Sequence, residues 1–191
     1  MTQAKSRFAT FEEYLSFDDG TDKLYELFNG ELVELPPESG ENVGITNFLF
    51  VQFATIVGYL RVRGHGLELE VRGEPRNRYP DLTIIQEEHI EQLKRRNTIR
   101  LSMEPPLLVI EAVSPGEAHR ERDYTDKRSQ YQDRGIPEYW LIDSNQQIIT
   151  VLQLEGNVYK KVGVFRGNDL IRSSEFPNLM LTAEQVLRAG Q

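Results

Sequence analysis

The sequence predicts an α/β fold, bordering on α+β, in which helices flank a mixed β-sheet and a hairpin lies near each end of the chain. Three observations support this fold. Apolar runs of strand length occur at 82–85 and 106–115, and long stretches typical of helices occur at 42–63 and 117–135. Turn residues, including Asn-Gly, separate paired apolar runs near both ends. The length of 191 residues suits one domain, spanning 1–191.

The chain is predicted to begin with a short helix and a hairpin. Thr10 can cap a helix over 11–15, and Glu13 completes a capping box. The segments YELF and ELVEL alternate on either side of Asn29-Gly30, a pair that tolerates the positive φ of a tight turn. We therefore expect the first two strands to pair here.

A long helix is predicted over 42–63, with Asn42 as its cap. Its apolar stripe consists of Ile45, Leu49, Phe53, Ile56 and Leu60. The next strands are predicted at 65–71 and 82–85. The second of them follows Tyr79-Pro80-Asp81, where a proline is tolerated because it precedes the strand.

The second half of the chain continues this mixture of strands and helices. Residues 87–100 are polar and are expected to form an exposed helix or loop, with a basic cluster at Lys94, Arg95, Arg96 and Arg100. This cluster, like the arginines of the loop 72–78, could contact phosphates or could be a solvated surface. The other elements are a strand at 106–115, a helix at 117–135 that ends at Gly135, a strand at 137–143, a hairpin of 147–153 with 158–165, and a short helix within 178–189.

Composition excludes several kinds of site. The chain has no cysteine, which rules out disulfides and zinc–thiolate centres and favours a reducing, cytoplasmic compartment. His65, His89 and His119 lack the spacing of a metal motif such as HExxH. A metal site is therefore expected to use oxygen ligands, which favours Mg²⁺, Mn²⁺ or Ca²⁺. No apolar run is long enough to cross a membrane, and the net charge of −8 argues against a protein that coats DNA non-specifically.

The strand that contains Glu111 carries this carboxylate among apolar side chains. Because side chains alternate along a strand, Glu111 shares one face with Leu107, Val109 and Val113. Burial of an unpaired carboxylate is costly, so a cation, a set of donors or a metal ion is expected beside it. Asp81 heads the preceding apolar strand. If the two strands are antiparallel neighbours, the two carboxylates meet at one edge of the sheet and need a divalent cation between them.

The helix at 117–135 brings Asp123, Lys127, Tyr131 and Arg134 onto one face. Lys127 could reach the carboxylates and offset charge in a phosphoryl-transfer transition state. The alternative is an ordinary helix pair between Asp123 and Lys127. A further alternative makes Glu111 a core carboxylate that is paired with Lys127 or with an arginine. Helical spacing alone does not separate these interpretations.

Four sequence blocks, in order, resemble a known family. The blocks are YELFNGELVEL, YPDLTII, PPLLVIEAVSP and DYTDKRSQYQDRGIPEYWLID, and they run from about 25 to 143. Together they resemble the restriction-endonuclease-like family long filed as a domain of unknown function, within the PD-(D/E)XK nuclease superfamily. The resemblance implies a restriction-endonuclease-like fold and a phosphodiesterase site that depends on Mg²⁺ or Mn²⁺.

Carried over position by position, the resemblance assigns the metal-binding carboxylates to Asp81 and Glu111. The lysine of the superfamily motif would stand two residues after the glutamate, where this chain has Val113. The resemblance to the narrower family implies that the lysine comes from the following helix instead. That lysine is Lys127 here, with Asp123 one turn earlier.

Two hypotheses follow. In the first, the chain is a DNA endonuclease in which Asp81 and Glu111 hold Mg²⁺ or Mn²⁺ and Lys127 stabilises phosphate charge, with a homodimer cutting both strands. In the second, the fold is a catalytically inactive module that binds nucleic acid or a protein partner, which the acidic charge and the missing strand lysine favour. Glu26 is a further acidic candidate for the site. Asn42, where many relatives have a histidine, is given no role.

Overall fold

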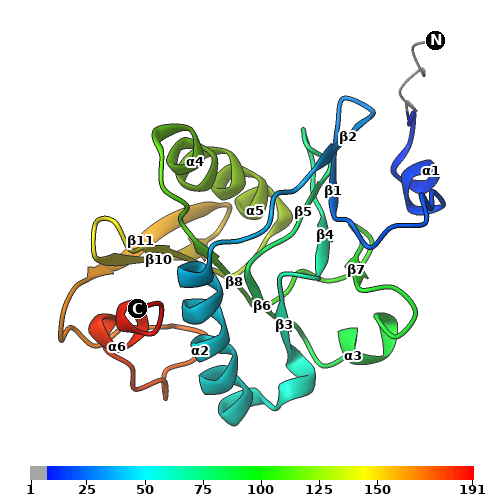
Figure 1. The fold of residues 1–191 in the computed structure, drawn as a ribbon. Helices are drawn as coiled ribbons and strands as arrows, with labels where there is room; N and C mark the ends of the chain where they lie inside the picture. Colours follow the sequence, from blue (N-terminus) through cyan, green and yellow to red (C-terminus); the bar gives the residue numbers. More distant parts are fainter. Residues whose placement is uncertain (1–7) are drawn as a thin grey trace.

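The computed structural model describes residues 8–191, except for the side chains of residues 118 and 119. Its centre is a six-stranded sheet with the strand order β11-β10-β9-β8-β6-β3 (Figure 1). In that order, the strands are Val158–Phe165, Ile148–Glu155, Glu138–Asp143, Leu108–Ala112, Leu82–Ile84 and Val62–Gly64. Strands β8 and β9 are parallel and all other neighbours are antiparallel, so the predicted mixed sheet is confirmed.

Helices cover both faces of this sheet (Figure 1). They are α2 (Gly40–Val57) and α6 (Ala183–Arg188) on one face, and on the other a continuous helix made of α4 (Glu117–Glu121), a π-helical segment (Arg122–Lys127) and α5 (Arg128–Arg134). Phe53 of α2 joins one apolar cluster with Ile110 of β8. Tyr131 of α5 joins a second cluster with Val109 of β8. The two clusters confirm the predicted alternation at Val109, Ile110 and Val113. The prediction for Leu107 is wrong, because this residue precedes β8 and packs against the cluster of Ile110.

Smaller elements complete the fold. They are α1 (Phe11–Leu15), the hairpin of β1 (Tyr25–Phe28) and β2 (Glu31–Glu34), a 3-10 turn (Tyr59–Arg61), α3 (His89–Gln92), and a three-stranded sheet of β5 (Asn77–Arg78), β4 (Glu68–Glu70) and β7 (Thr98–Ile99). The predicted hairpin turn is confirmed, with φ of 49° at Asn29 and 78° at Gly30. Thr10 caps α1 by accepting a hydrogen bond from the Glu13 N–H at 3.1 Å. The Glu13 carboxylate accepts from the Ala9 N–H at 2.8 Å, one residue earlier than a capping box requires.

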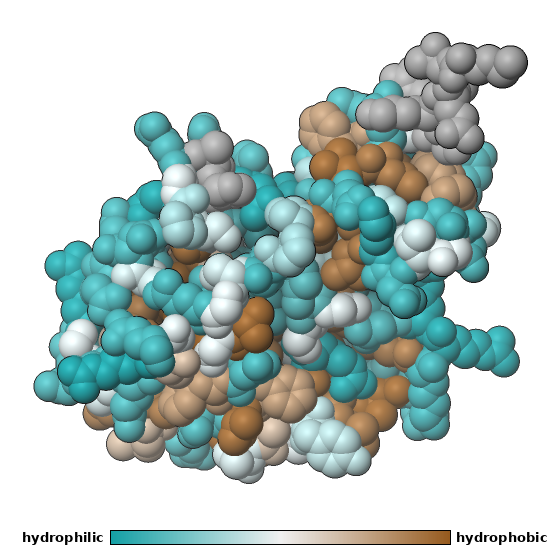
Figure 2. All heavy atoms as spheres, viewed as in Figure 1, coloured by the Kyte–Doolittle hydropathy of each residue, from teal (hydrophilic) through white to brown (hydrophobic). Residues whose placement is uncertain are grey.

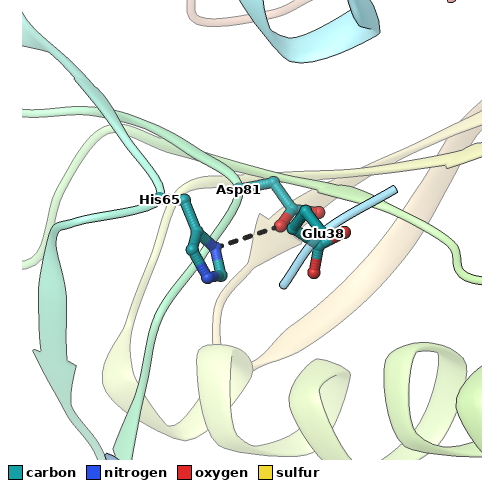
Figure 3. A group of neighbouring side chains, drawn as sticks. All are labelled: Glu38, His65 and Asp81. Atoms are coloured by element: carbon teal, nitrogen blue, oxygen red, sulfur yellow. Dashed lines mark ion pairs between the residues drawn. The ribbon is translucent and has the colours of Figure 1, made fainter. Parts of the chain in front are cut away.

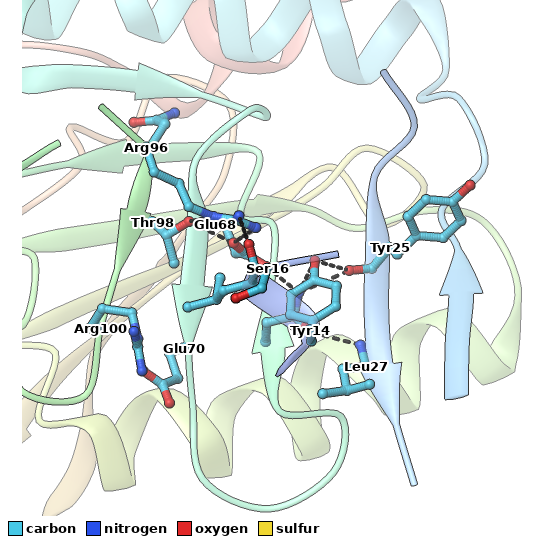
Figure 4. A network of polar contacts seen from close by, with 12 residues as sticks. Tyr14, Ser16, Tyr25, Leu27, Glu68, Glu70, Arg96, Thr98 and Arg100 are labelled. Atoms are coloured by element: carbon cyan, nitrogen blue, oxygen red, sulfur yellow. Dashed lines mark hydrogen bonds and ion pairs between the residues drawn. The ribbon is translucent and has the colours of Figure 1, made fainter. Parts of the chain in front are cut away.

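A polar network joins α1 to the three-stranded sheet (Figure 4). Arg96 forms an ion pair with Glu68 of β4 at 3.4 Å and donates a hydrogen bond to the Leu15 carbonyl at the end of α1, at 2.6 Å. Arg100 pairs with Glu70 at 2.7 Å. Two arginines of the basic cluster, for which the sequence left phosphate contact and a solvated surface as alternatives, are therefore engaged within the protein.

The long helix differs from its prediction at both ends. Its N-cap is Ser39, whose hydroxyl accepts a hydrogen bond from the Asn42 N–H at 3.1 Å, so the prediction that Asn42 is the cap is wrong. The helix ends before Gly58, where a φ of 83° takes the backbone out of helical geometry. As a result Leu60 lies outside α2 and is exposed, and Val62–Gly64 forms β3 instead of helix.

The polar segment 87–100 is not wholly exposed, as the sequence had suggested. It contains α3 and β7, and His89 is fully buried. The Nδ1 atom of His89 accepts a hydrogen bond from the Gln86 N–H at 3.2 Å, and its Nε2 lies 3.0 Å from the Glu104 carbonyl. This pairing needs the neutral ring with its proton on Nε2.

Within residues 8–191, no helix combines the length and the apolar character that a bilayer crossing requires. On the face drawn in Figure 2, hydrophilic side chains predominate and apolar side chains show between them in separate areas.

Candidate active site

Asp81 and Glu111 lie at the same end of two neighbouring antiparallel strands. The register of β6 and β8 pairs Leu82 with Ile110, so Asp81 and Glu111 lie opposite each other one residue further along the two strands. Beyond the paired strands, a side chain takes the place of a backbone acceptor: the Ala112 N–H donates a hydrogen bond to Asp81 Oδ2 at 2.7 Å. Both acidic residues are buried, with exposed fractions of 7% and 1%. The sheet therefore fixes the position of both carboxylates.

Lys127 joins Glu111 to Asp123. Its Nζ lies 2.7 Å from Glu111 Oε2 and 2.9 Å from Asp123 Oδ1. The Tyr131 hydroxyl donates to the other oxygen of Glu111, Oε1, at 2.6 Å. These partners come from the π-helical segment and α5 on the same face of the sheet. The structure thus brings together three predicted site residues, and both oxygens of Glu111 are engaged.

Burial and charge set the protonation of this cluster. Burial raises the pKa of Glu111 to about 7, while attraction to Lys127 opposes that shift and repulsion by Asp81 adds to it. Burial lowers the pKa of Lys127, but the attraction of Glu111 and Asp123 outweighs it, so the pKa of Lys127 is raised. Lys127 is therefore a cation at neutral pH. Burial also raises the pKa of the Tyr131 hydroxyl well above its usual value, so Tyr131 remains a donor.

A pocket of about 250 Å³ opens beside this cluster. The ionisable side chains in its lining are Glu26, Glu38, His65, Asp81, Arg122 and Lys127, together with Tyr79. Glu111 is not one of the described residues that line the pocket. The cluster therefore contacts the pocket through Asp81 and Lys127. Arg122 adds a second cation. Its Nε lies 3.7 Å from Asp123 Oδ1 and makes no hydrogen bond to a described residue.

Glu26 reaches the pocket, but its carboxylate is already paired. Arg78 Nη1 donates to both Glu26 oxygens, at 3.0 and 3.2 Å, and Arg78 Nε donates to Gln130 Oε1 at 2.7 Å. Arg78, one of the loop arginines considered for phosphate contact, is thus engaged in a buried ion pair. Glu26 as an acidic member of the site stays a prediction.

Asp81 has two neighbours that the sequence did not predict. One ligand atom from each of Glu38, His65 and Asp81 lies within 4.8 Å of the others. His65 Nδ1 is 3.4 Å from Asp81 Oδ1, and the Glu38 carboxylate lies beside them (Figure 3). The polar contact with Asp81 raises the pKa of His65, and burial opposes this shift.

The proximity of His65 to Asp81 depends on the pairing of two strands that are distant in the sequence, and no local pattern indicates it. Gly64 of β3 pairs with Leu82 of β6, so the residue after β3 lies beside the residue before β6. A sequence interpretation that placed a strand, not helix, at Val62–Gly64 would have put His65 next to Asp81. Glu38 lies between β2 and α2 and carries no sequence signal of this kind.

The donor set beside Asp81 fits a divalent cation. Glu38 and Asp81 offer carboxylate oxygens and His65 offers an imidazole nitrogen, and the two negative charges match the charge of such an ion. The expectation of oxygen ligands alone overlooked this imidazole. Each oxygen of Glu111 accepts one hydrogen bond, from Lys127 or from Tyr131, and keeps a lone pair with which it could bind a metal ion.

Comparison with known proteins identifies the family. The Uma2 family, described as putative restriction endonucleases, matches residues 11–184. The crystal structure of a putative nuclease belonging to DUF820 from Anabaena variabilis is similar, with a TM-score of 0.73 and 18% identity over 96% of this chain and 100% of that chain, which shows a shared fold. No curated protein matches. The chain belongs to the Uma2 family of putative restriction endonucleases.

Proposed function

We propose that this chain is a divalent-metal-dependent DNA endonuclease that hydrolyses phosphodiester bonds. The observation that carries the proposal is the pocket to which Asp81 contributes a carboxylate and Lys127 an ammonium group. Phosphoryl transfer needs acidic ligands for a metal ion and a cation for the charge that develops on phosphate, and this pocket has both kinds of group. Family membership and the fold shared with a putative nuclease support the proposal.

Asp81 and Glu111 are the proposed ligands of Mg²⁺ or Mn²⁺. Such an ion, when bound, lowers the pKa of a coordinated water and neutralises phosphate charge. The Ala112 N–H orients the Asp81 carboxylate through Oδ2, which leaves Oδ1 for a ligand. Glu111 contributes an oxygen that also accepts a hydrogen bond from the helix.

Lys127 and Arg122 are proposed to offset the negative charge of the phosphate. Lys127 is held in place by Glu111 and Asp123, and its raised pKa keeps it charged. A cation that is already oriented in a buried site stabilises a transition state more than the same cation in water does. In this proposal Asp123 positions Lys127 and does not touch the substrate, and Glu26 remains a supporting acid at the edge of the pocket.

The alternative function is a catalytically inactive module that binds nucleic acid or a protein partner. A specific observation favours it: Lys127 and Tyr131 already satisfy both oxygens of Glu111, which leaves this residue complete without a metal. Val113 in place of a strand lysine and the net charge of −8 agree with that function.

Cleavage of supercoiled plasmid in Mg²⁺ or Mn²⁺ tests the two functions. We expect the wild type to cut and Asp81→Asn, which keeps the size of the side chain, to lose at least about a hundredfold in rate. Glu41→Gln, an exposed acid in the first turn of α2, is the matched control and should cut normally. Cutting that survives Asp81→Asn would place the activity elsewhere. Wild-type protein that binds DNA but never cuts it would favour the module.

The form of the product tests the proposed homodimer. A dimer with two sites converts supercoiled plasmid directly to linear DNA, whereas a monomer accumulates nicked circles first. Sedimentation velocity on the same samples, with and without an oligonucleotide duplex, reports the number of chains in the complex.

A further inference from the structure

The Asp81 carboxylate uses its two oxygens differently. Oδ2 accepts the Ala112 N–H at 2.7 Å, while Oδ1 faces His65 Nδ1 at 3.4 Å. His65 Nδ1 is buried and makes no hydrogen bond to any residue that the structure describes. A buried polar atom that makes no hydrogen bond costs free energy, and a cation that takes the Nδ1 lone pair reduces that cost.

Glu38 supplies a third group to the same point. Its carboxylate, His65 and Asp81 each offer one atom, and these atoms lie within 4.8 Å of one another (Figure 3). Ligand atoms that lie ~2.0–2.2 Å from a common ion are spaced by roughly 3–4 Å. His65 Nδ1 and Asp81 Oδ1, at 3.4 Å, have this spacing, and no two of the three ligand atoms are more than 4.8 Å apart.

Hydrogen bonds connect both carboxylates of this trio to the backbone of one residue of β8, Ala112, directly for Asp81 and through Asn42 for Glu38. Asn42 Nδ2 donates to Glu38 Oε2 at 3.1 Å and to the Ala112 carbonyl at 3.2 Å, while the Ala112 N–H donates to Asp81. Asn42 is buried in the first turn of α2. Outer partners of this kind orient the ligands of metal sites. The trio is therefore a supported site, and not a chance meeting of acids on the surface.

We propose that Glu38, His65 and Asp81 form a divalent-cation site whose imidazole ligand makes it prefer a first-row transition ion, such as Mn²⁺, to Mg²⁺. Imidazole nitrogen suits transition ions, whereas Mg²⁺ prefers an octahedral shell of oxygens. The role of this ion in DNA cleavage rests on the proposed function, but the site itself does not. The ion is placed on the His65 side of Asp81, where Glu111 is not among its ligands.

Pulsed electron paramagnetic resonance of the full chain with Mn²⁺ alone tests this site. A bound imidazole gives a ¹⁴N modulation of the Mn²⁺ echo. We expect that modulation in the wild type and in Glu41→Gln, and its loss in both His65→Ala and His65→Asp. Competition with Mg²⁺ should show a preference of at least about tenfold for Mn²⁺, and His65→Asp, which replaces the nitrogen ligand by oxygen, should abolish that preference. Circular dichroism confirms that each variant is folded.

The outcomes separate this proposal from the nuclease proposal. Wild type that binds no Mn²⁺, that gives no nitrogen modulation, or that keeps the modulation in both His65 variants overturns the transition-metal site. If Asp81→Asn abolishes cleavage in Mg²⁺ while His65→Ala changes neither cleavage nor Mn²⁺ binding, the endonuclease stands and the site fails. If Mn²⁺ binds through His65 and no DNA is cut, the site stands and the endonuclease fails.

Discussion

Lys127 Nζ lies 2.7 Å from Glu111 Oε2, across sixteen positions of sequence, and both side chains are almost completely buried. The strand and the helix that follows it thus share a buried ion pair, and Asp123 on the helix forms a second pair with the same lysine at 2.9 Å. This pair provides both a stabilising contact and the cation of the proposed site. Substitutions at its two ends, which remove different charges, distinguish these roles.

Glu111→Ala should destabilise the fold by ~3–5 kcal/mol, because it leaves Lys127 and the Tyr131 hydroxyl buried with fewer partners. The measurement is the free energy of unfolding from urea denaturation. Glu91→Ala is the matched control, since Glu91 also forms an ion pair with a lysine, Lys94, but at the surface. This control should change stability only slightly. Equal effects at the two sites would contradict the importance of the buried pair.

Lys127→Met should reduce the rate of DNA cleavage by ~10²–10³-fold, because it removes an oriented cation from the phosphate pocket. The same variant should keep its Mn²⁺ site, since Glu38, His65 and Asp81 are unchanged. Single-turnover cleavage and Mn²⁺ titration measure the two effects on one sample. Lys23→Met, which removes an exposed lysine paired with Glu34, is the control and should behave as the wild type in both.

Arg122→Ala should weaken DNA binding and lower the slope of log K against log salt by about one, because one phosphate contact is lost. The free Nε donor of Arg122 and its place in the pocket lining support this prediction. Fluorescence anisotropy of a labelled duplex at several salt concentrations measures the slope. Arg95→Ala, in the exposed part of the basic cluster, is the control. A larger effect at Arg95 would move the phosphate contact away from the pocket.

Asn42→Ala should lower the affinity for Mn²⁺ by ~10–100-fold, because Glu38 and the Ala112 carbonyl lose their shared donor. Isothermal titration calorimetry measures this change. Asn47→Ala removes an exposed amide from the same helix and should leave the affinity unchanged. An unchanged affinity in Asn42→Ala would show that Asn42 only fastens the helix to the strand.

His89 should make the protein less stable in acid. Burial lowers the pKa of His89 below its usual 6.5, so the unfolded chain binds more protons as the pH falls. The stability from His89 is complete above about pH 6.5 and is lost as the pH falls through its lower folded pKa. His89→Gln should flatten the dependence of unfolding free energy on pH in this window. His65 shifts in the opposite direction, so His65→Asn should change the slope with the opposite sign.

The parts of the fold that sequence could predict are those set by local chemistry. Asn29-Gly30 specifies its turn because both residues accept a positive φ. The two-residue alternation around Glu111 specifies which side chains meet the helix, and the four-residue step from Asp123 to Lys127 specifies a pair. The meeting of Lys127 with Glu111 followed from the need of a buried carboxylate for a cation.

The features that sequence did not predict depend on contacts between distant segments. Ser39 replaced Asn42 as the cap because Asn42 is drawn inward to Ala112, a contact between α2 and β8 that no local pattern encodes. His65 joins Asp81 through strand pairing, and Glu38 through the path of a loop. The proximity of these side chains was therefore predicted where one strand and one helix bring them together, and missed where a third segment enters.

The backbone of Ala112 offers a way to observe the acidic site in solution. Its N–H donates a hydrogen bond to Asp81 and its carbonyl accepts one from Asn42, so the backbone of one residue links the sheet to the acidic site and to the first turn of α2. A change in the charge around Asp81 should therefore shift the ¹⁵N resonance of Ala112 and the ¹³C resonance of its carbonyl together. Solvent exchange of the same amide proton should slow when a cation stiffens this link. A single backbone position can thus act as a spectroscopic gauge of occupancy, without any label in the pocket.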